Sequence, residues 1–153
     1  MSWDQKFLRM ALQMASWSKD PSTKVGCVIA GVDHEIRSTG YNGMCRGIND
    51  NVPERNIRPA KYMWYEHSER NAICNAARVG IPLNGCTMYL TSIPTKFPPC
   101  CDCARAIIQS GIIRVVQEPI HGDEATIQRW KESCDVTMEM FAEAGIIFDQ
   151  VEI

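Results

Sequence analysis

The chain has 153 residues, of which 45% are hydrophobic and 22% charged, a composition that excludes a disordered or fibrous protein. Its 16 lysines and arginines against 18 aspartates and glutamates give a net charge of −2, so nothing indicates a polynucleotide partner. The longest apolar runs, such as Val25–Gly31 and Gly111–Val116, are too short to cross a bilayer. Because the N-terminus also lacks the pattern of a secretory signal, we expect a cytoplasmic protein without a membrane partner.

The first third of the chain predicts a helix, a hairpin and a long loop. Apolar residues recur at helical spacing through Ser2–Lys19, where Ser2 is a suitable cap and Asp20-Pro21 a stop signal. Val25–Ala30 and Glu35–Tyr41 flank a short turn and are typical of two strands of a hairpin. The loop that follows extends to about Lys61, and a loop of that length inside a compact domain is usually functional or mobile.

The rest of the chain alternates helices with strands. Alanines and Ile73 indicate a helix over His67–Val79, ended by Gly80, before a strand over Cys86–Thr91. The remaining elements follow as helix, strand, helix and strand: Cys100–Ser110, Ile112–Gln117, Asp123–Ala144 and Ile146–Val151. This order predicts a single α/β domain over 1–153, a three-layer sandwich with a mixed five-stranded sheet and helices on both faces.

Two short motifs carry residues that bind metals, and each stands where a helix begins. The first is His67-Ser68-Glu69, and the second is Pro99-Cys100-Cys101-Asp102-Cys103. Thiols three residues apart lie on one helix face, and the positive end of the helix favours their thiolate form. His67, Cys100 and Cys103 therefore make a candidate zinc site, since zinc prefers sulfur and imidazole ligands.

The number of ligands separates a catalytic zinc site from a structural one. Three protein ligands leave one position open for water, and Glu69 is close enough in sequence to take a proton from that water. Two other interpretations remain open at this point, a dithiol redox site and a structural zinc site. The candidates for a fourth ligand in the structural site are Cys74, Cys86 and Cys101.

Together the two motifs make the sequence resemble the cytidine and deoxycytidylate deaminase superfamily, whose zinc enzymes share an H-x-E…P-C-x-x-C signature. The likeness covers nearly the whole chain and points to the deoxycytidylate branch. The segments that carry it are Lys24–Ile29, Gly40–Gly43, Glu69–Ala72 and Ile107–Ile112. The resemblance implies the fold of that superfamily, a Zn²⁺ cofactor and hydrolytic deamination of dCMP to dUMP and ammonia, with Glu69 as the proton carrier.

The resemblance also implies binding roles for individual residues. Asn42 is expected to bind the sugar, with Ser68 and Lys24 also at the substrate. The stretch Gly43–Asp50 is similar to one that binds nucleoside triphosphates such as dCTP and dTTP. The expected regulatory residues are Asn42, Gly43, Arg46 and Asp50. The candidates for the phosphate of a monophosphate substrate are Lys24, Arg46, Arg55, Arg58 and Lys61. The resemblance implies a homo-oligomer, a hexamer, as well.

Three features depart from the family pattern. Ser68 stands where alanine is usual, and Cys45 replaces a usual proline in the regulatory stretch. The segment Thr91–Pro99 is several residues longer than the family's loop between strand and zinc motif, and that loop helps to form the base pocket. Two alternatives therefore stand beside dCMP deamination. One is a deaminase of another small base or modified nucleotide, and the other is a non-catalytic, zinc-stabilised nucleotide-sensing module.

Overall fold

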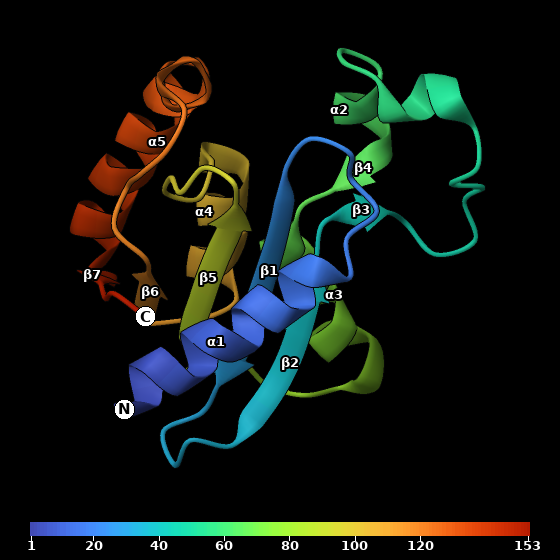
Figure 1. The fold of residues 1–153 in the computed structure, drawn as a ribbon. Coiled ribbons are helices and arrows are strands. Elements are labelled where there is room, and N and C mark those ends of the chain that lie inside the picture. The colour runs from blue at the N-terminus through green and yellow to red at the C-terminus, as the bar shows by residue number, and fades with distance from the viewer.

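A five-stranded mixed sheet forms the centre of the molecule, and the computed structural model describes all 153 residues (Figure 1). Its strands are β1 (Lys24–Ala30), β2 (Ile36–Tyr41), β5 (Thr87–Ile93), β6 (Arg114–Gln117) and β7 (Ile147–Gln150). They lie side by side in the order β2-β1-β5-β6-β7. β1 is antiparallel to both of its neighbours, whereas β5, β6 and β7 run parallel. The expected mixed sheet is confirmed.

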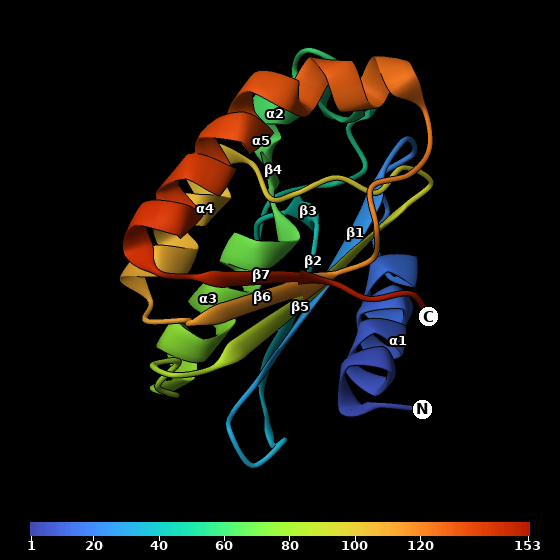
Figure 2. The same cartoon turned by 90° about the vertical axis from the view of Figure 1, so that its left-hand side faces the viewer.

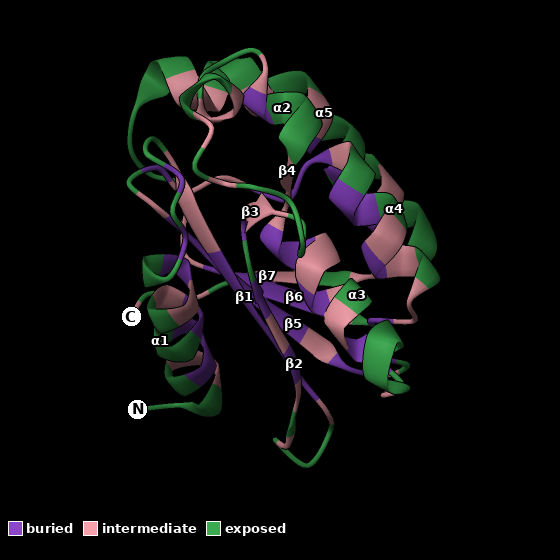
Figure 3. Cartoon of the chain, turned by 90° about the vertical axis from the view of Figure 1, so that its right-hand side faces the viewer, coloured by how far each residue is buried: buried purple, intermediate pink, exposed green.

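Helices cover both faces of this sheet, which confirms the three-layer arrangement (Figure 2). On one face lies α1, and on the other lie α3, α4 and α5. Their bounds are Trp3–Ser16, Ser68–Val79, Cys101–Gln109 and Glu124–Ala144, respectively. The strands supply buried side chains alternately to the two faces, and Figure 3 colours the buried residues of the strands purple. Val116 packs under α1, while its neighbour Val115 packs under α3 and α4.

The helix ends follow the expected capping residues. Ser2 and Gln5 form a reciprocal capping box at the start of α1. Gly80 and Gly145 end α3 and α5 in the left-handed conformation that glycine adopts without strain. α1 ends at Ser16, earlier than expected, because the chain turns there to place Ser18 and the residues after it against β2. None of the helices is both long and apolar enough to span a bilayer.

The long loop before the first metal motif contains short elements that the sequence pattern does not reveal. They are β3 (Gly43–Met44), the 3-10 turn η1 (Pro53–Asn56), α2 (Lys61–Trp64) and β4 (Tyr65–Glu66). β3 and β4 pair in antiparallel register, with Gly43 opposite Glu66. This two-stranded ladder brings the chain after Asn42 next to the residue that precedes His67, and it thereby closes one side of the site.

Candidate active site

The two helices that carry the metal motifs begin beside each other. His67 is the N-cap of α3 and Cys100 is the N-cap of α4, both in extended backbone conformation. The Nδ1 atom of His67 lies 3.4 Å from the sulfur of Cys100 and 3.4 Å from that of Cys103. A tetrahedral zinc ion with ordinary bond lengths would separate nitrogen and sulfur by about 3.6 Å. The three side chains therefore fit a zinc ion without rearrangement, and all three ligand atoms lie within 4.8 Å of one another.

The protonation of the two thiols reflects their closeness. A hydrogen bond from Cys103 and the neighbouring His67 ring hold the pKa of Cys100 well below its usual range, against the effect of burial. The same hydrogen bond, together with burial, raises the pKa of Cys103. A dication that binds both sulfurs takes them as thiolates and displaces any thiol proton. Burial tends to lower the pKa of His67, but the hydrogen bond to Cys100 and the negative charges of Glu69 and Cys100 together outweigh it and raise that pKa.

Helix α5 holds the start of α4 in place from behind. The Thr137 hydroxyl donates a hydrogen bond of 2.7 Å to the carbonyl of Pro99. The Ser133 hydroxyl accepts one of 2.8 Å from the N–H of Cys101. Because these bonds flank Cys100 on both sides, they fix the backbone of a metal ligand through atoms that do not touch the metal.

Glu69 occupies the first turn of α3, next to the metal ligands. Its side chain is 4% exposed, and the Ser68 hydroxyl donates a hydrogen bond of 2.8 Å to its Oε2 atom. Burial raises the pKa of this carboxyl above its ordinary value. A buried carboxyl beside a metal site has the properties of a general acid and base.

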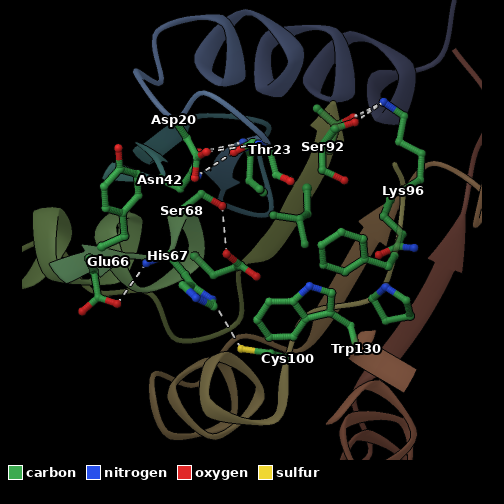
Figure 4. Close-up of a pocket in the computed structure, with 18 of the residues that line it drawn as sticks. Asp20, Thr23, Asn42, Glu66, His67, Ser68, Ser92, Lys96, Cys100 and Trp130 are labelled. Atoms are coloured by element: carbon green, nitrogen blue, oxygen red, sulfur yellow. Dashed lines mark hydrogen bonds between the residues drawn. The ribbon is translucent and has the colours of Figure 1, made fainter. Parts of the chain in front are cut away.

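A pocket opens over these residues and is drawn in Figure 4. Asp20 and Asn42 lie at one side of it, Ser92 and Lys96 at the other, and His67 and Cys100 between them. Aromatic rings form a wall near the metal ligands. Phe97 and Trp130 stack with their centroids 5.9 Å apart, and Trp130 and His67 make a T-shaped contact with their centroids 6.0 Å apart. Flat apolar walls with few polar groups suit a nucleobase.

Asn42 lines this pocket, as the sequence predicts, but its amide already has three partners. Its oxygen accepts the N–H of Val25 at 2.8 Å, and its nitrogen donates to the Thr23 carbonyl and to Asp20. Because both amide hydrogens are engaged, Asn42 holds the start of β1 in place, and only one lone pair of its oxygen is free for a ligand.

The five basic candidates for phosphate binding are not equivalent. Lys24 does not line the pocket: its ammonium donates to the carbonyl of Ser18, while its neighbours Thr23 and Val25 face the cavity. Lys61 lines the pocket, but its ammonium is hydrogen-bonded to Asp20 and Ser22. Arg58 lines the pocket and has no hydrogen bond or ion pair within the chain. The other two candidates, Arg46 and Arg55, lie outside the pocket.

The expected regulatory residues lie along the outer loop and do not meet at one cavity. Arg46 donates to the side chain of Asn75, and Asp50 pairs with Lys19 at 2.7 Å on the surface. Gly43 sits in the β3–β4 ladder, and Asn42 alone of the four lines the pocket. Their regulatory role stays a prediction.

Several pocket residues carry no motif and were not predicted. They are Asp20, Lys96, Gln117, Glu118 and Trp130. Asp20 lies between α1 and β1 and Trp130 lies in the first half of α5, so only the folded chain brings them to the pocket. The length of the loop before Cys100 was the one available signal for Lys96.

Three metal ligands with one open position, and a carboxylate in the dry interior beside them, define the class of zinc-dependent hydrolytic deaminases. The model of the cytidine and deoxycytidylate deaminase zinc-binding region matches residues 1–118. The chain therefore belongs to the cytidine and deoxycytidylate deaminase family. The resemblance inferred from the sequence and the zinc cofactor are confirmed.

Individual relatives agree with this assignment. A deaminase encoded in the luxG 3' region of Aliivibrio fischeri is 39% identical over 144 residues, which cover 94% of this chain and 90% of the relative. Human deoxycytidylate deaminase is 37% identical over 137 residues, covering 84% and 73%. The solved dCMP deaminase of cyanophage S-TIM5, in complex with dCMP and dUMP, superposes with a TM-score of 0.72 at 19% identity. That superposition covers 96% of this chain and 95% of the phage protein, and it shows the shared fold.

Proposed function

We propose that this chain catalyses the hydrolytic deamination of dCMP to dUMP and ammonia. The observation that carries the proposal is the buried Glu69 beside the triad of His67, Cys100 and Cys103, at the bottom of an aromatic-walled pocket. The relatives named deoxycytidylate deaminase support the choice of nucleotide. A non-catalytic zinc module is not favoured, because such a module has no use for a buried carboxylate beside its metal.

The chain's own residues divide the work of the reaction. Zinc held by the three ligands supplies a Lewis acid and, at neutral pH, an activated water. The Ser68 hydroxyl binds Oε2 of Glu69 and leaves Oε1 free to face the substrate. Glu69 accepts the two protons of the attacking water one after the other, and it passes the first to ring atom N3 and the second to the leaving amino group, so one carboxylate acts as base and then as acid in each transfer. The aromatic wall of Phe97 and Trp130 orients the ring and excludes water.

Arg58 is the best candidate for the phosphate contact. It is the one basic side chain of the pocket whose charge has no partner in the chain, since Lys61 is paired with Asp20 and Lys96 with Glu118. A guanidinium matches the geometry of a phosphate and forms charge-assisted hydrogen bonds to it. A monophosphate substrate would therefore satisfy the unpaired arginine.

The proposal is tested by the release of ammonia from a panel of substrates. The panel contains dCMP, CMP, deoxycytidine, cytosine and the adenine and guanine monophosphates. We expect dCMP to be best, with kcat/KM about 10- to 100-fold above deoxycytidine, because each charge-assisted bond contributes about 1.5–3 kcal/mol. Equal values for the two would remove the phosphate site, and inactivity on every cytosine compound would overturn the proposal.

We also propose that the protein is a cytoplasmic homo-oligomer, a hexamer, which responds to dCTP and dTTP. Exposed apolar side chains next to the active site support a contact between copies: Ile57, Tyr62, Met63 and Trp64. Eight free cysteines support a reducing compartment. Light scattering at micromolar concentration, with and without each triphosphate, tests the assembly. A monomer under all conditions would contradict it.

A further inference from the structure

A row of exposed apolar side chains runs along one flank of α1, on the outside of the molecule (Figure 1). Trp3, Met10 and Trp17 are 48%, 36% and 56% exposed, respectively. Each stands seven residues from the next, which is about two helical turns, so all three lie on the same flank and span about 21 Å. We call these three side chains the tryptophan row.

The tryptophan row serves neither the core of the chain nor the substrate pocket. The residues of α1 that pack on the sheet are others: Phe7, Leu8, Ala11 and Ala15. No member of the row lines the pocket. Single exposed apolar residues are ordinary, but tryptophan and methionine are enriched where proteins contact one another. A regular row of them therefore indicates a protein partner.

Neighbouring side chains already hold both tryptophans in place. The ring of His34 stacks on Trp3 with the centroids 4.4 Å apart, and the Lys6 ammonium lies 4.1 Å from the centroid of the same ring. Tyr41 meets Trp17 in a T-shaped contact at 6.1 Å. Side chains that are fixed before binding lose little conformational entropy in a complex, and such tryptophans are typical anchors of an interface.

The spacing of the row matches that of a second copy of the same chain. Trp3 and Trp17 are equally far from Met10 along the helix. A two-fold axis that passes beside Met10, perpendicular to α1, therefore brings each Trp3 next to Trp17 of the other copy and each Met10 next to its equivalent. Contacts between identical chains that close on themselves have this symmetry, in which one patch is complementary to itself.

The charges of α1 are compatible with this pairing. Asp4 is bound by Arg114 on the inner side of the helix. Arg9 stands one position before Met10, about 100° around the helix from the row. Lys6 comes opposite the region of Gln13, whose amide nitrogen already donates to Ser16 and whose oxygen can accept from a lysine. Like charges therefore do not meet across the axis.

The exposed area is also of the right order. If a whole aromatic side chain presents about 200–250 Å², the row and the neighbouring Tyr41 leave about 400 Å² uncovered on each copy. Two copies together would bury about 800 Å² from these residues alone, out of the about 1,200 Å² of a small stable interface. The exposed polar residues Lys6, Gln13 and Ser16 beside the row would add to this area.

We propose that the tryptophan row is a contact between two copies of this chain, in which the two α1 helices pack antiparallel about a two-fold axis at Met10. This contact is separate from the exposed patch beside the active site, and it rests on the proposed assembly but not on the proposed reaction. A two-fold contact by itself ends at a dimer, so a hexamer would use both surfaces.

The first test measures particle mass by light scattering on a sizing column at micromolar concentration. Met10→Glu places two carboxylates together at the axis, and Trp17→Ser removes an anchor. Each should reduce the wild-type mass to half or less, with unchanged zinc content and thermal unfolding. The control Arg9→Glu adds the same carboxylate to an exposed position away from the row and should keep the wild-type mass. A wild-type mass in Met10→Glu, or an equal loss in Arg9→Glu, overturns the proposal.

The second test places a cysteine at the axis. With copper phenanthroline as the oxidant, the two thiols of paired Met10→Cys chains should form a disulfide, since a residue at a two-fold axis lies beside its equivalent. A dimer band should appear on a non-reducing gel and disappear with dithiothreitol. Wild type and Arg9→Cys measure the background from the exposed Cys45 and Cys74. If Met10→Cys gives no more dimer than Arg9→Cys, the proposed axis is wrong.

The outcomes separate this contact from the other proposals. A monomeric wild type overturns both the contact and the proposed assembly. If the wild type assembles and Met10→Glu keeps its mass, the contact alone falls. Ammonia release from dCMP is measured on the same samples, and a wild type that loses mass with Met10→Glu but releases no ammonia would overturn the proposed reaction and leave the contact standing.

Discussion

Arg58, Lys61 and Lys24 carry the same charge but differ in what that charge already contacts. The ammonium of Lys61 is 2.9 Å from Asp20 and that of Lys24 is 2.6 Å from the carbonyl of Ser18. Arg58 has no such partner and stands at the pocket. We therefore choose Arg58 as the phosphate contact because its charge has no partner in the chain, whereas the charges of the two lysines do.

Replacing Arg58 by glutamine should raise KM for dCMP and leave deoxycytidine almost unaffected. The lost charge-assisted bonds correspond to about a 10- to 100-fold fall in kcat/KM for the nucleotide alone. Steady-state kinetics on both substrates measure this difference. Arg55→Gln is the matched control, because Arg55 stacks on Trp64 outside the pocket. A parallel loss on dCMP and deoxycytidine would mean that Arg58 supports the fold and not the phosphate.

How far the sequence predicts the site depends on how local each residue's role is. Cys100 and Cys103 were predicted together because their spacing within one turn of helix makes their side chains converge, and His67 because its motif with Glu69 also begins a helix. Lys24 was offered for substrate binding, yet strand alternation turns it away from the pocket. The amide of Gln117 is buried in the pocket wall without a hydrogen-bond partner, which depends on what surrounds it in three dimensions, and no sequence pattern reports it.

At the scale of elements, one buried ion pair ties the outer loop to the sheet. Lys61 begins α2, and its ammonium is hydrogen-bonded to Asp20, which lies between α1 and β1. Asp20 also accepts the N–H groups of Ser22 and Thr23. Burial tends to raise the pKa of Asp20, but these bonds outweigh it and hold the pKa below its usual value.

Loss of this pair should destabilise the fold in a pH-dependent way. Because the pKa of Asp20 is lower in the folded chain, its contribution is complete above about pH 4 and disappears as the pH falls through the folded value. Asp20→Asn leaves a buried ammonium without its counter-charge and should cost about 3–5 kcal/mol at neutral pH. Urea unfolding at pH 7 and pH 3 measures the free energy of unfolding of both proteins. The difference between Asp20→Asn and wild type should be smaller at pH 3 than at pH 7.

A surface pair provides the control for that measurement. Asp50 pairs with Lys19, whose side chain is 75% exposed, so Asp50→Asn should change stability little at either pH. If the difference in free energy of unfolding between Asp20→Asn and wild type is the same at both pH values, the assigned role of the Asp20 carboxylate is contradicted.

The elements that escaped prediction share one physical property, which is shortness. β3 and β4 have two residues each and α2 has four, so each covers only about one period of its pattern, and a strand or helix is recognised over several. They are stabilised by contacts with distant parts of the chain, such as that of Lys61 with Asp20. The long helices and the five strands of the sheet were predicted because each repeats its pattern over several turns or alternations.

At the scale of the whole molecule, the sheet positions the chemistry by joining segments far apart in sequence. β1 joins β2, which leads to Asn42, to β5, which leads to the zinc motif. The next strand, β6, pairs with β5 and ends at Gln117. The alternation of helices and strands was enough to predict this architecture, since parallel strands joined by helices leave few arrangements. That residues 1–153 act as one domain, and that several copies assemble, stay predictions.

Ammonia release from dCMP by the wild type and by Glu69→Gln, at matched zinc content, tests the central claim most directly. Glutamine keeps the size of the side chain but cannot accept a proton, so the variant should fold, retain one zinc per chain and lose at least about 10²- to 10⁴-fold in turnover. A zinc-loaded Glu69→Gln that deaminates dCMP at nearly the wild-type rate would contradict the account, as would a zinc-loaded wild type that releases no ammonia from dCMP.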